Sequence, residues 1–297
     1  MNALTTIAAV LNPLLMIALP ILLGIVLASR LKVEWRLYAL GMVTYVASQV
    51  LHFPFNQWVL NPVLQRLAPH PSSGSMELLV VALLLGLSAG VFEETARLLM
   101  LLGPLRQARS WREGLMFGAG HGGVEAILAG LVVFYVLIQL VALRDVDLAA
   151  TLDPSQVEAA RTALATFWGM PWYEHLLPTV ERVIGLCLHL ALSILVLQAL
   201  TRRNWLWFLL AVLWHALLDA LAVFAMQTWG VYATEGLVAA CGLLSLGMIW
   251  LLRNREPAAS VPAESPLAPT LRATAVPTPE QTIAPEALES SRYHSGN

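Results

Sequence analysis

Seven apolar segments follow one another along the chain, and they constrain its fold more than any other feature. A helix needs about 20 apolar residues to cross the roughly 30 Å hydrocarbon core of a bilayer. Inside a membrane, a helix is one of the few structures that satisfies every backbone hydrogen bond. The sequence therefore predicts an all-α, polytopic transmembrane helical bundle. Its expected spans are residues 5–28, 36–59, 76–103, 113–142, 175–200, 205–227 and 231–252.

The composition agrees with a membrane protein. Hydrophobic residues make up 58% of the chain and charged residues 12%, whereas a typical soluble domain has roughly 45–50% and about 25%. The net charge of -2 provides no basic surface for a nucleic acid, so no nucleic-acid partner is expected. Cys187 and Cys241 both lie in apolar segments, where we expect buried thiols and no disulfide.

Basic residues gather in alternate connections between the expected spans. They are Arg30, Lys32 and Arg36, then Arg106, Arg109 and Arg112, then Arg202 and Arg203, and finally Arg253 and Arg255. Since basic residues favour the cytoplasmic side, the amino terminus is predicted to lie outside and the carboxyl terminus in the cytoplasm. Residues 1–252 would form the membrane domain. Residues 253–297, rich in Pro, Ala, Ser and Thr, would form a disordered cytoplasmic tail.

The connection between the fourth and fifth spans contains a further helix start. Asp153 is suited to cap a helix, and Pro154 follows at the first helical position. Such a helix would lie flat on the outer leaflet or would act as a lid over a substrate entrance. The sequence leaves these two alternatives open.

Charged residues interrupt the third apolar segment at Glu93, Glu94 and Arg97. Each ionised side chain near the middle of a membrane helix costs roughly 2.5–3.5 kcal/mol, so three of them indicate a function. Three other segments carry one histidine each at a similar depth: His121, His189 and His215. Counted from the basic flanks at about 1.5 Å per residue, these groups lie roughly 14–20 Å from the cytoplasmic boundary. Four helices thus place titratable groups in one layer.

Members of this layer also pair along individual helices. The pairs at a separation of four residues are Glu93 with Arg97, His121 with Glu125, and His215 with Asp219. Positions three or four apart share one helical face, so each pair can direct two polar groups at the same point. A lone intramembrane histidine often serves only as an interhelical hydrogen-bonding group, and this structural alternative remains open for His52 and His189. Glu181 and Arg182 could likewise form an interfacial pair.

Glycines recur beside the layer at intervals of four residues. They are Gly86 and Gly90 in the third span and Gly114, Gly118 and Gly122 in the fourth. Small residues at this spacing allow membrane helices to approach closely. We therefore expect the third and fourth spans to pack tightly against each other.

Carboxylates and imidazoles at one depth suit the activation of water. A glutamate can take a proton from a water molecule that is held between it and an imidazole. A second imidazole, with its carboxylate neighbour, can stabilise the oxyanion that forms on a peptide carbonyl. This chemistry needs no cofactor.

Zinc chemistry is the alternative. His121, His215 and a carboxylate would suit a catalytic zinc with one open position, with His189 as a further candidate ligand and another glutamate as base. The sequence lacks the HExxH signature, which weakens this version without excluding it.

At these residues the sequence resembles the YhfC family of bacterial intramembrane proteases and, more distantly, the PrsW and CAAX-processing families. The matching elements are Glu93-Glu94-x-x-Arg97, Phe117-x-x-x-His121-Gly122-Gly123-Val124-Glu125, Glu181-Arg182 with His189, and His215-x-x-x-Asp219. Their order and spacing resemble the YhfC pattern over about residues 76–225. No single motif is specific, whereas the ordered set is.

The resemblance implies a multi-pass peptidase of a bacterial-type plasma membrane that acts on a membrane protein or peptide. Carried over by motif, Glu93 would be the general base, His121 would hold the attacking water, and His215 with Asp219 would form the oxyanion site. The family has been described both as a glutamate-type and as a metalloprotease family. In the CAAX-type pattern the arginine comes one position later than Arg97, which leaves open whether Glu93 or Glu94 is the base.

A second class of function uses the same residues without hydrolysis. A membrane scaffold could bind a partner helix or an ion at the polar layer, and a proton-coupled transporter could relay protons through it. The substrate, the cleavage site and the oligomeric state do not follow from the sequence.

Overall fold

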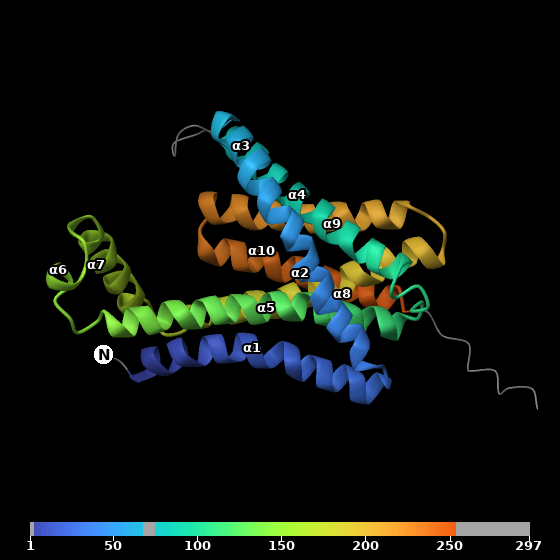
Figure 1. Ribbon diagram of the computed structural model, residues 1–297, viewed down its shortest axis with the longest axis horizontal. Coiled ribbons are helices and arrows are strands. Elements are labelled where there is room, and N and C mark those ends of the chain that lie inside the picture. The colour runs from blue at the N-terminus through green and yellow to red at the C-terminus, as the bar shows by residue number, and fades with distance from the viewer. Residues whose placement is uncertain (1–2, 68–74, 254–297) are drawn as a thin grey trace, which may run out of the picture. The chain divides into compact units, whose positions relative to one another are not determined.

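A computed structural model describes residues 3–67 and 75–253, which are helical almost throughout (Figure 1). The helices are α1 (Ala3–Leu31), α2 (Trp35–Phe55), α3 (Asn61–Leu67), α4 (Ser75–Leu102), α5 (Trp111–Ala142), α6 (Leu148–Thr151), α7 (Pro154–Gly169), α8 (Leu177–Thr201), α9 (Leu206–Thr228) and α10 (Val231–Leu251). No strand occurs in these described ranges. The predicted all-α bundle is confirmed. Apart from Arg253, the tail predicted for residues 253–297 lies outside the described residues.

Six helical segments among the described residues are long and apolar enough to cross a membrane. They comprise α1, α4, α5, α9, α10 and the segment Glu174–Thr201, which contains α8. The second expected span is also helical, as α2, but it is not one of these six. Its polar residues Ser48, Gln49 and His52 lower its hydropathy, and Gln49 donates a hydrogen bond to Glu93 of α4. Six of the seven expected spans are thus supported as candidate membrane helices.

Local sequence signals explain several helix ends. Ser110 caps α5, and Glu113 completes a capping box by accepting from the Ser110 backbone N–H. Pro154 occupies the first turn of α7, as the sequence predicts, after Asp153 at the N-cap position. A π-helical turn at Asn56–Leu60 joins α2 to α3. These signals account for the start of α5, the start of α7 and the junction of α2 with α3.

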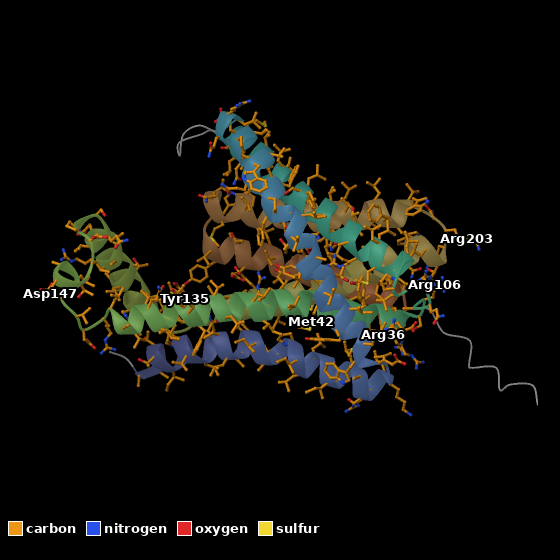
Figure 2. The ribbon with its side chains drawn as sticks, viewed as in Figure 1. Arg36, Met42, Arg106, Tyr135, Asp147 and Arg203 are labelled. Carbon is orange, nitrogen blue, oxygen red and sulfur yellow. The ribbon has the colours of Figure 1, made fainter. Side chains whose placement is uncertain are left out.

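The connections between α1 and α2, α4 and α5, and α8 and α9 contain or adjoin arginine residues and lie together at one end of the bundle (Figure 2). We call them the arginine-containing connections. Figure 2 places Arg36, Arg106 and Arg203 at this end and Asp147 at the opposite end, close to α6 and α7. The same clustering was expected from the alternation of basic residues along the sequence. It agrees with a position of these connections on one side of the membrane. That this is the cytoplasmic side remains a prediction.

The glycines bring helix backbones together, but in pairs that differ from our expectation. A Cβ on Gly90 of α4 would lie 2.7 Å from the Val212 carbonyl oxygen of α9. A Cβ on Gly118 of α5 would lie 2.8 Å from the His189 carbonyl oxygen of α8. The predicted tight packing of the third span against the fourth is therefore wrong, because α4 packs mainly on α9. A glycine stripe shows that some backbone approaches without showing which one.

Replacing Gly120 with alanine should destabilise the bundle. The added Cβ would overlap the Tyr38 carbonyl of α2, and a backbone atom cannot move aside as a flexible side chain can. Forcing extra atoms into a packed core typically costs about 1–3 kcal/mol, which a denaturation curve in detergent micelles would measure. Gly247→Ala in α10 is the control, because a Cβ there meets nothing within 4 Å. Equal stability of the two variants would contradict the close α2–α5 contact.

Candidate active site

Four membrane helices bring one cluster of acidic, basic and histidine side chains together. We call it the polar cluster, and its members are Glu93, Glu94 and Arg97 of α4, His121 and Glu125 of α5, His189 of α8, and His215 and Asp219 of α9. Contacts of α4 with α9 and of α5 with α8 hold these helices together. All seven residues that the sequence predicted for the site, together with His189, therefore belong to one cluster.

Glu93 lies at the centre of the polar cluster. Its Oε2 atom is 3.0 Å from His121 Nε2 and 4.0 Å from His215 Nε2. Its Oε1 atom accepts a hydrogen bond of 3.0 Å from the side-chain amide of Gln49. One carboxylate oxygen is thus held by α2, and the other faces two imidazoles.

Glu94 has a different environment, because it is fully buried and forms the closer ion pair with Arg97, whose Nη2 atom lies 3.8 Å from Glu93 Oε2. Arg97 donates to its Oε1 atom through Nη1, and His215 Nδ1 lies 2.8 Å from the same oxygen. Both Glu94 and Arg97 have side chains that are 0% exposed. Glu94 therefore neutralises Arg97 and orients His215, whereas Glu93 keeps an oxygen directed at the histidines.

His189 connects the two halves of the polar cluster. Arg97 Nη2 donates to its Nδ1 atom over 2.6 Å, and its Nε2 atom lies 2.5 Å from Glu125 Oε2. The second oxygen of Glu125 accepts from Arg182 Nη1 at 2.6 Å. Arg182 thus binds Glu125 across the helix interface, so the interfacial Glu181–Arg182 pair is not the arrangement found.

His52 belongs to a separate hydrogen-bonded group. Its Nε2 atom is 3.1 Å from Ser88 Oγ and 3.0 Å from Asn56 Nδ2, and its ring stacks on Phe92. These contacts agree with the structural alternative for His52. His189, by contrast, is part of the polar cluster.

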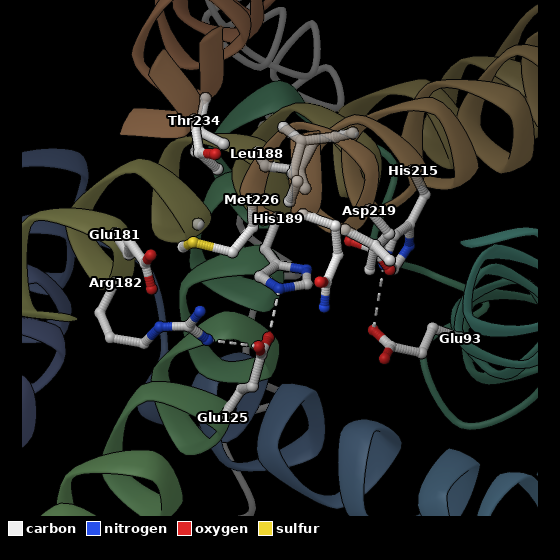
Figure 3. A pocket seen from close by; sticks show the side chains of 16 residues that line it. Glu93, Glu125, Glu181, Arg182, Leu188, His189, His215, Asp219, Met226 and Thr234 are labelled. Carbon is white, nitrogen blue, oxygen red and sulfur yellow. Dashed lines mark hydrogen bonds and ion pairs between the residues drawn. The ribbon is translucent and has the colours of Figure 1, made fainter. Parts of the chain in front are cut away.

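A cavity of about 430 Å³ reaches the polar cluster (Figure 3). Five members line it: Glu93, Glu125, His189, His215 and Asp219. His215 Nε2 is 3.6 Å from Asp219 Oδ2, as their spacing of four residues predicts. A molecule in the cavity would meet the carboxylate of Glu93 and the His215–Asp219 pair side by side (Figure 3), since His215 Nε2 lies 4.0 Å from Glu93 Oε2.

Gln49 is the cluster contact that sequence reasoning missed. It lies in α2, far from the charged motifs, and its amide fixes one oxygen of Glu93. A polar residue inside an apolar segment is a signal in itself, since such residues rarely face lipid. That signal could have added Gln49 to the candidate site residues, but it could not have identified Glu93 as the partner of Gln49.

The donor set at the centre of the polar cluster suits a metal ion. Glu93, His121 and His189 are buried, and each offers one ligand atom, all of these atoms lying within 4.8 Å of one another. Of the two histidines in this set, His189 also has a carboxylate partner, Glu125, at its Nε2 atom. Histidine ligands of metals commonly have such a partner on the other ring nitrogen. The residues therefore fit a divalent ion such as zinc.

Comparisons with known proteins identify the family of this chain. A family profile described as YhfC intramembrane metalloprotease matches residues 15–241, a range that contains the whole polar cluster. The chain is 31% identical over 172 residues to a protein of Bacillus subtilis (strain 168), "Uncharacterized membrane protein YhfC". The alignment covers 57% of this chain and 67% of that protein. No solved structure matches the chain. From the extent of the profile match, the chain belongs to the YhfC intramembrane metalloprotease family.

Proposed function

We propose that this protein is an intramembrane endopeptidase that hydrolyses a peptide bond within or beside the membrane. The observation that carries the proposal is the position of Glu93. Its carboxylate lies 3.0 Å from His121 Nε2 and also lines the cavity. A water molecule in the cavity can therefore reach a base that an imidazole already orients.

The same geometry favours Glu93 over Glu94 as the base. Glu94 is 0% exposed, lies in an ion pair with Arg97, and is not among the cavity-lining residues. Its negative charge is already used to neutralise a buried arginine. We assign Glu94 a positioning role through His215, whose Nδ1 atom it holds.

Beside Glu93, His215 and Asp219 would act on the peptide carbonyl. His215 Nδ1 is held by Glu94, which leaves Nε2 facing Glu93 and Asp219 at 4.0 and 3.6 Å. When His215 is an imidazolium, Nδ1 donates to Glu94 and the N–H at Nε2 can donate to the oxygen on which negative charge develops. The group that activates water and the group that stabilises the oxyanion would thus be neighbours at one end of the cavity.

A metal ion held by Glu93, His121 and His189 would supply Lewis acidity toward water and a peptide carbonyl. The family description and the donor set both support this version. Arg97 donates to His189 Nδ1, and that nitrogen cannot use one lone pair for both the arginine and a metal. Binding through Nδ1 would therefore require Arg97 to release His189.

Purified protein tests the proposed activity. We expect it to cleave members of a fluorogenic library of apolar peptides in detergent micelles, with two product peptides from each cut identified by mass spectrometry. Persistent absence of cleavage, also with single-span membrane proteins in liposomes, would contradict the peptidase and favour a scaffold or transporter.

Metal analysis tests the metal version separately. We expect about one divalent ion per chain in purified protein, and Glu125→Gln should weaken its binding about 10- to 100-fold, as loss of a ligand's carboxylate partner commonly does. His175→Ala is the control, since His175 is buried outside the polar cluster, beside Phe167. If preparations with far less than one ion per chain cleaved peptides, and chelators did not affect the rate, the metal version would be contradicted. Glu93 and His121 would then activate water without a metal.

A further inference from the structure

The cavity at the polar cluster continues along three helices toward one end of the bundle. Its residues on α9 run from His215 to Gln227 and recur at intervals of three and four, which defines one helical face. On α8 the lining begins at Glu181, and on α10 it includes Thr234. Figure 3 shows Glu181 and Thr234 on the side of the cavity away from Glu93.

Exposure increases along this face. His215 is 3% exposed and the Asp219 side chain 36%, while Met226, near the end of α9, is 42% exposed. Gln227, the last cavity residue of α9, is also exposed. The cavity is therefore closed at the polar cluster and open near the junction of α9 and α10.

Apolar side chains form the wall between these two ends. They are Leu188, Leu218, Ala222, Val223, Met226 and Val238. The volume of about 430 Å³ lies within the range of about 300–1,000 Å³ that is usual for ligand sites. An apolar wall that leads to a carboxylate and imidazoles suits an extended segment with apolar side chains better than it suits an ion.

The open end lies opposite the arginine-containing connections. Helix α9 ends at Thr228 and α10 begins at Val231, and their junction is at the end of the bundle where α6 and α7 lie (Figure 1). Arg106 and Arg203 lie at the other end (Figure 2). Since arginine-rich connections favour the cytoplasm, this opening would face the non-cytoplasmic side.

We propose that this cavity is a substrate channel, entered from the side opposite the arginine-containing connections, that binds an extended peptide with an apolar side chain beside the scissile bond. The binding of a peptide rests on the proposed function. The opening does not, because it is argued from the lining and exposure of α9. Two separate measurements therefore test the two parts.

Cysteine labelling tests the opening without any enzymatic assay. In a background with Cys187 and Cys241 replaced by serine, we would treat Ala222→Cys and Met226→Cys variants with a membrane-impermeant maleimide. Both should react in intact spheroplasts. A Leu217→Cys variant should not react, since Leu217 is 44% exposed, is not a cavity residue and would face lipid. Arg106→Cys should react only in inverted vesicles.

The labelling results show whether the cavity opens to water on the non-cytoplasmic side. Reaction of Ala222→Cys and Met226→Cys from the spheroplast exterior supports such an opening. Reaction of either variant only in inverted vesicles, or of neither from any side, overturns it. These results hold whether or not the protein cleaves peptides, so failure of the channel and failure of the proposed function are distinguishable.

Substrate preference tests the apolar wall. Ala222→Leu narrows the channel by three carbon atoms, and a difference of one methylene in an apolar pocket commonly changes kcat/KM by about 10- to 200-fold. We expect kcat/KM to fall at least 10-fold for peptides with a bulky apolar residue beside the cut and much less for those with alanine. Leu217→Phe, on the opposite face of α9, should leave the preference unchanged. Equal effects on all peptides would overturn the assignment of this wall to substrate side chains.

Discussion

Replacing Glu93 with glutamine is expected to lower peptide hydrolysis about 100- to 10,000-fold, which is the usual contribution of a general acid or base. Glutamine keeps the size of the side chain and can still accept from Gln49 through its carbonyl oxygen. It cannot take a proton from water, and it is a poorer metal ligand than a carboxylate. Both versions of the mechanism therefore predict the loss, which initial rates of peptide cleavage would measure.

The control for this variant is Glu158→Gln on α7. Glu158 has an exposed side chain that pairs only loosely with Arg161, at 3.4 Å. Its replacement should leave both the rate and the melting temperature unchanged. If Glu93→Gln cleaved at more than half the rate of the unmodified protein, another group would have to be the base.

Replacing Arg97 with methionine is expected to destabilise the fold by about 3–5 kcal/mol, the range found when one partner of a buried ion pair is removed. Glu94 would then keep a negative charge at 0% exposure with only His215 as its partner. Its second oxygen already has no hydrogen-bond partner among the described residues. Denaturation in detergent micelles would measure the loss.

Two further variants separate the charge effect from simple loss of packing. Adding Glu94→Gln to Arg97→Met removes the unpaired charge and should restore much of the stability, because the two substitutions act on one interaction. Arg161→Met breaks an exposed pair and should change stability by no more than about 1 kcal/mol. If Arg97→Met and Arg161→Met had equal effects, the buried ion pair would not be structural.

The membrane bundle and the members of its site were predictable from sequence for one physical reason. Charged and imidazole groups are costly in a membrane helix, so Glu93, Arg97 and His121 stand out against apolar neighbours and indicate a shared interior. Spacing along one helix also placed His215 and Asp219 together correctly, since an i to i+4 separation depends only on local geometry.

Helix pairing was not predictable in this way. Gly90 lies against α9, and Gly118 lies against α8, because a glycine permits close approach of any neighbouring backbone. Long-range hydrogen bonds were equally inaccessible, such as Gln49 to Glu93 and Arg182 to Glu125. These contacts depend on which helices meet, and a single sequence contains no direct record of that.

Hydropathy also separated α2 from the other expected spans. Its length is sufficient for a membrane helix, but Ser48, Gln49 and His52 reduce its apolar character. Ser48 and His52 are buried in the bundle. The same residues that weaken the membrane signal bring α2 to the polar cluster through Gln49.

Hydrolysis in ¹⁸O-labelled water tests most directly whether Glu93 activates water against a peptide bond. Purified protein and the Glu93→Gln variant would be incubated with one cleaved peptide, and the products analysed by mass spectrometry. We predict one ¹⁸O atom in the new carboxyl terminus for the unmodified protein and at least a 100-fold slower appearance of that product for the variant. Label incorporation at equal rates by both proteins would contradict the account.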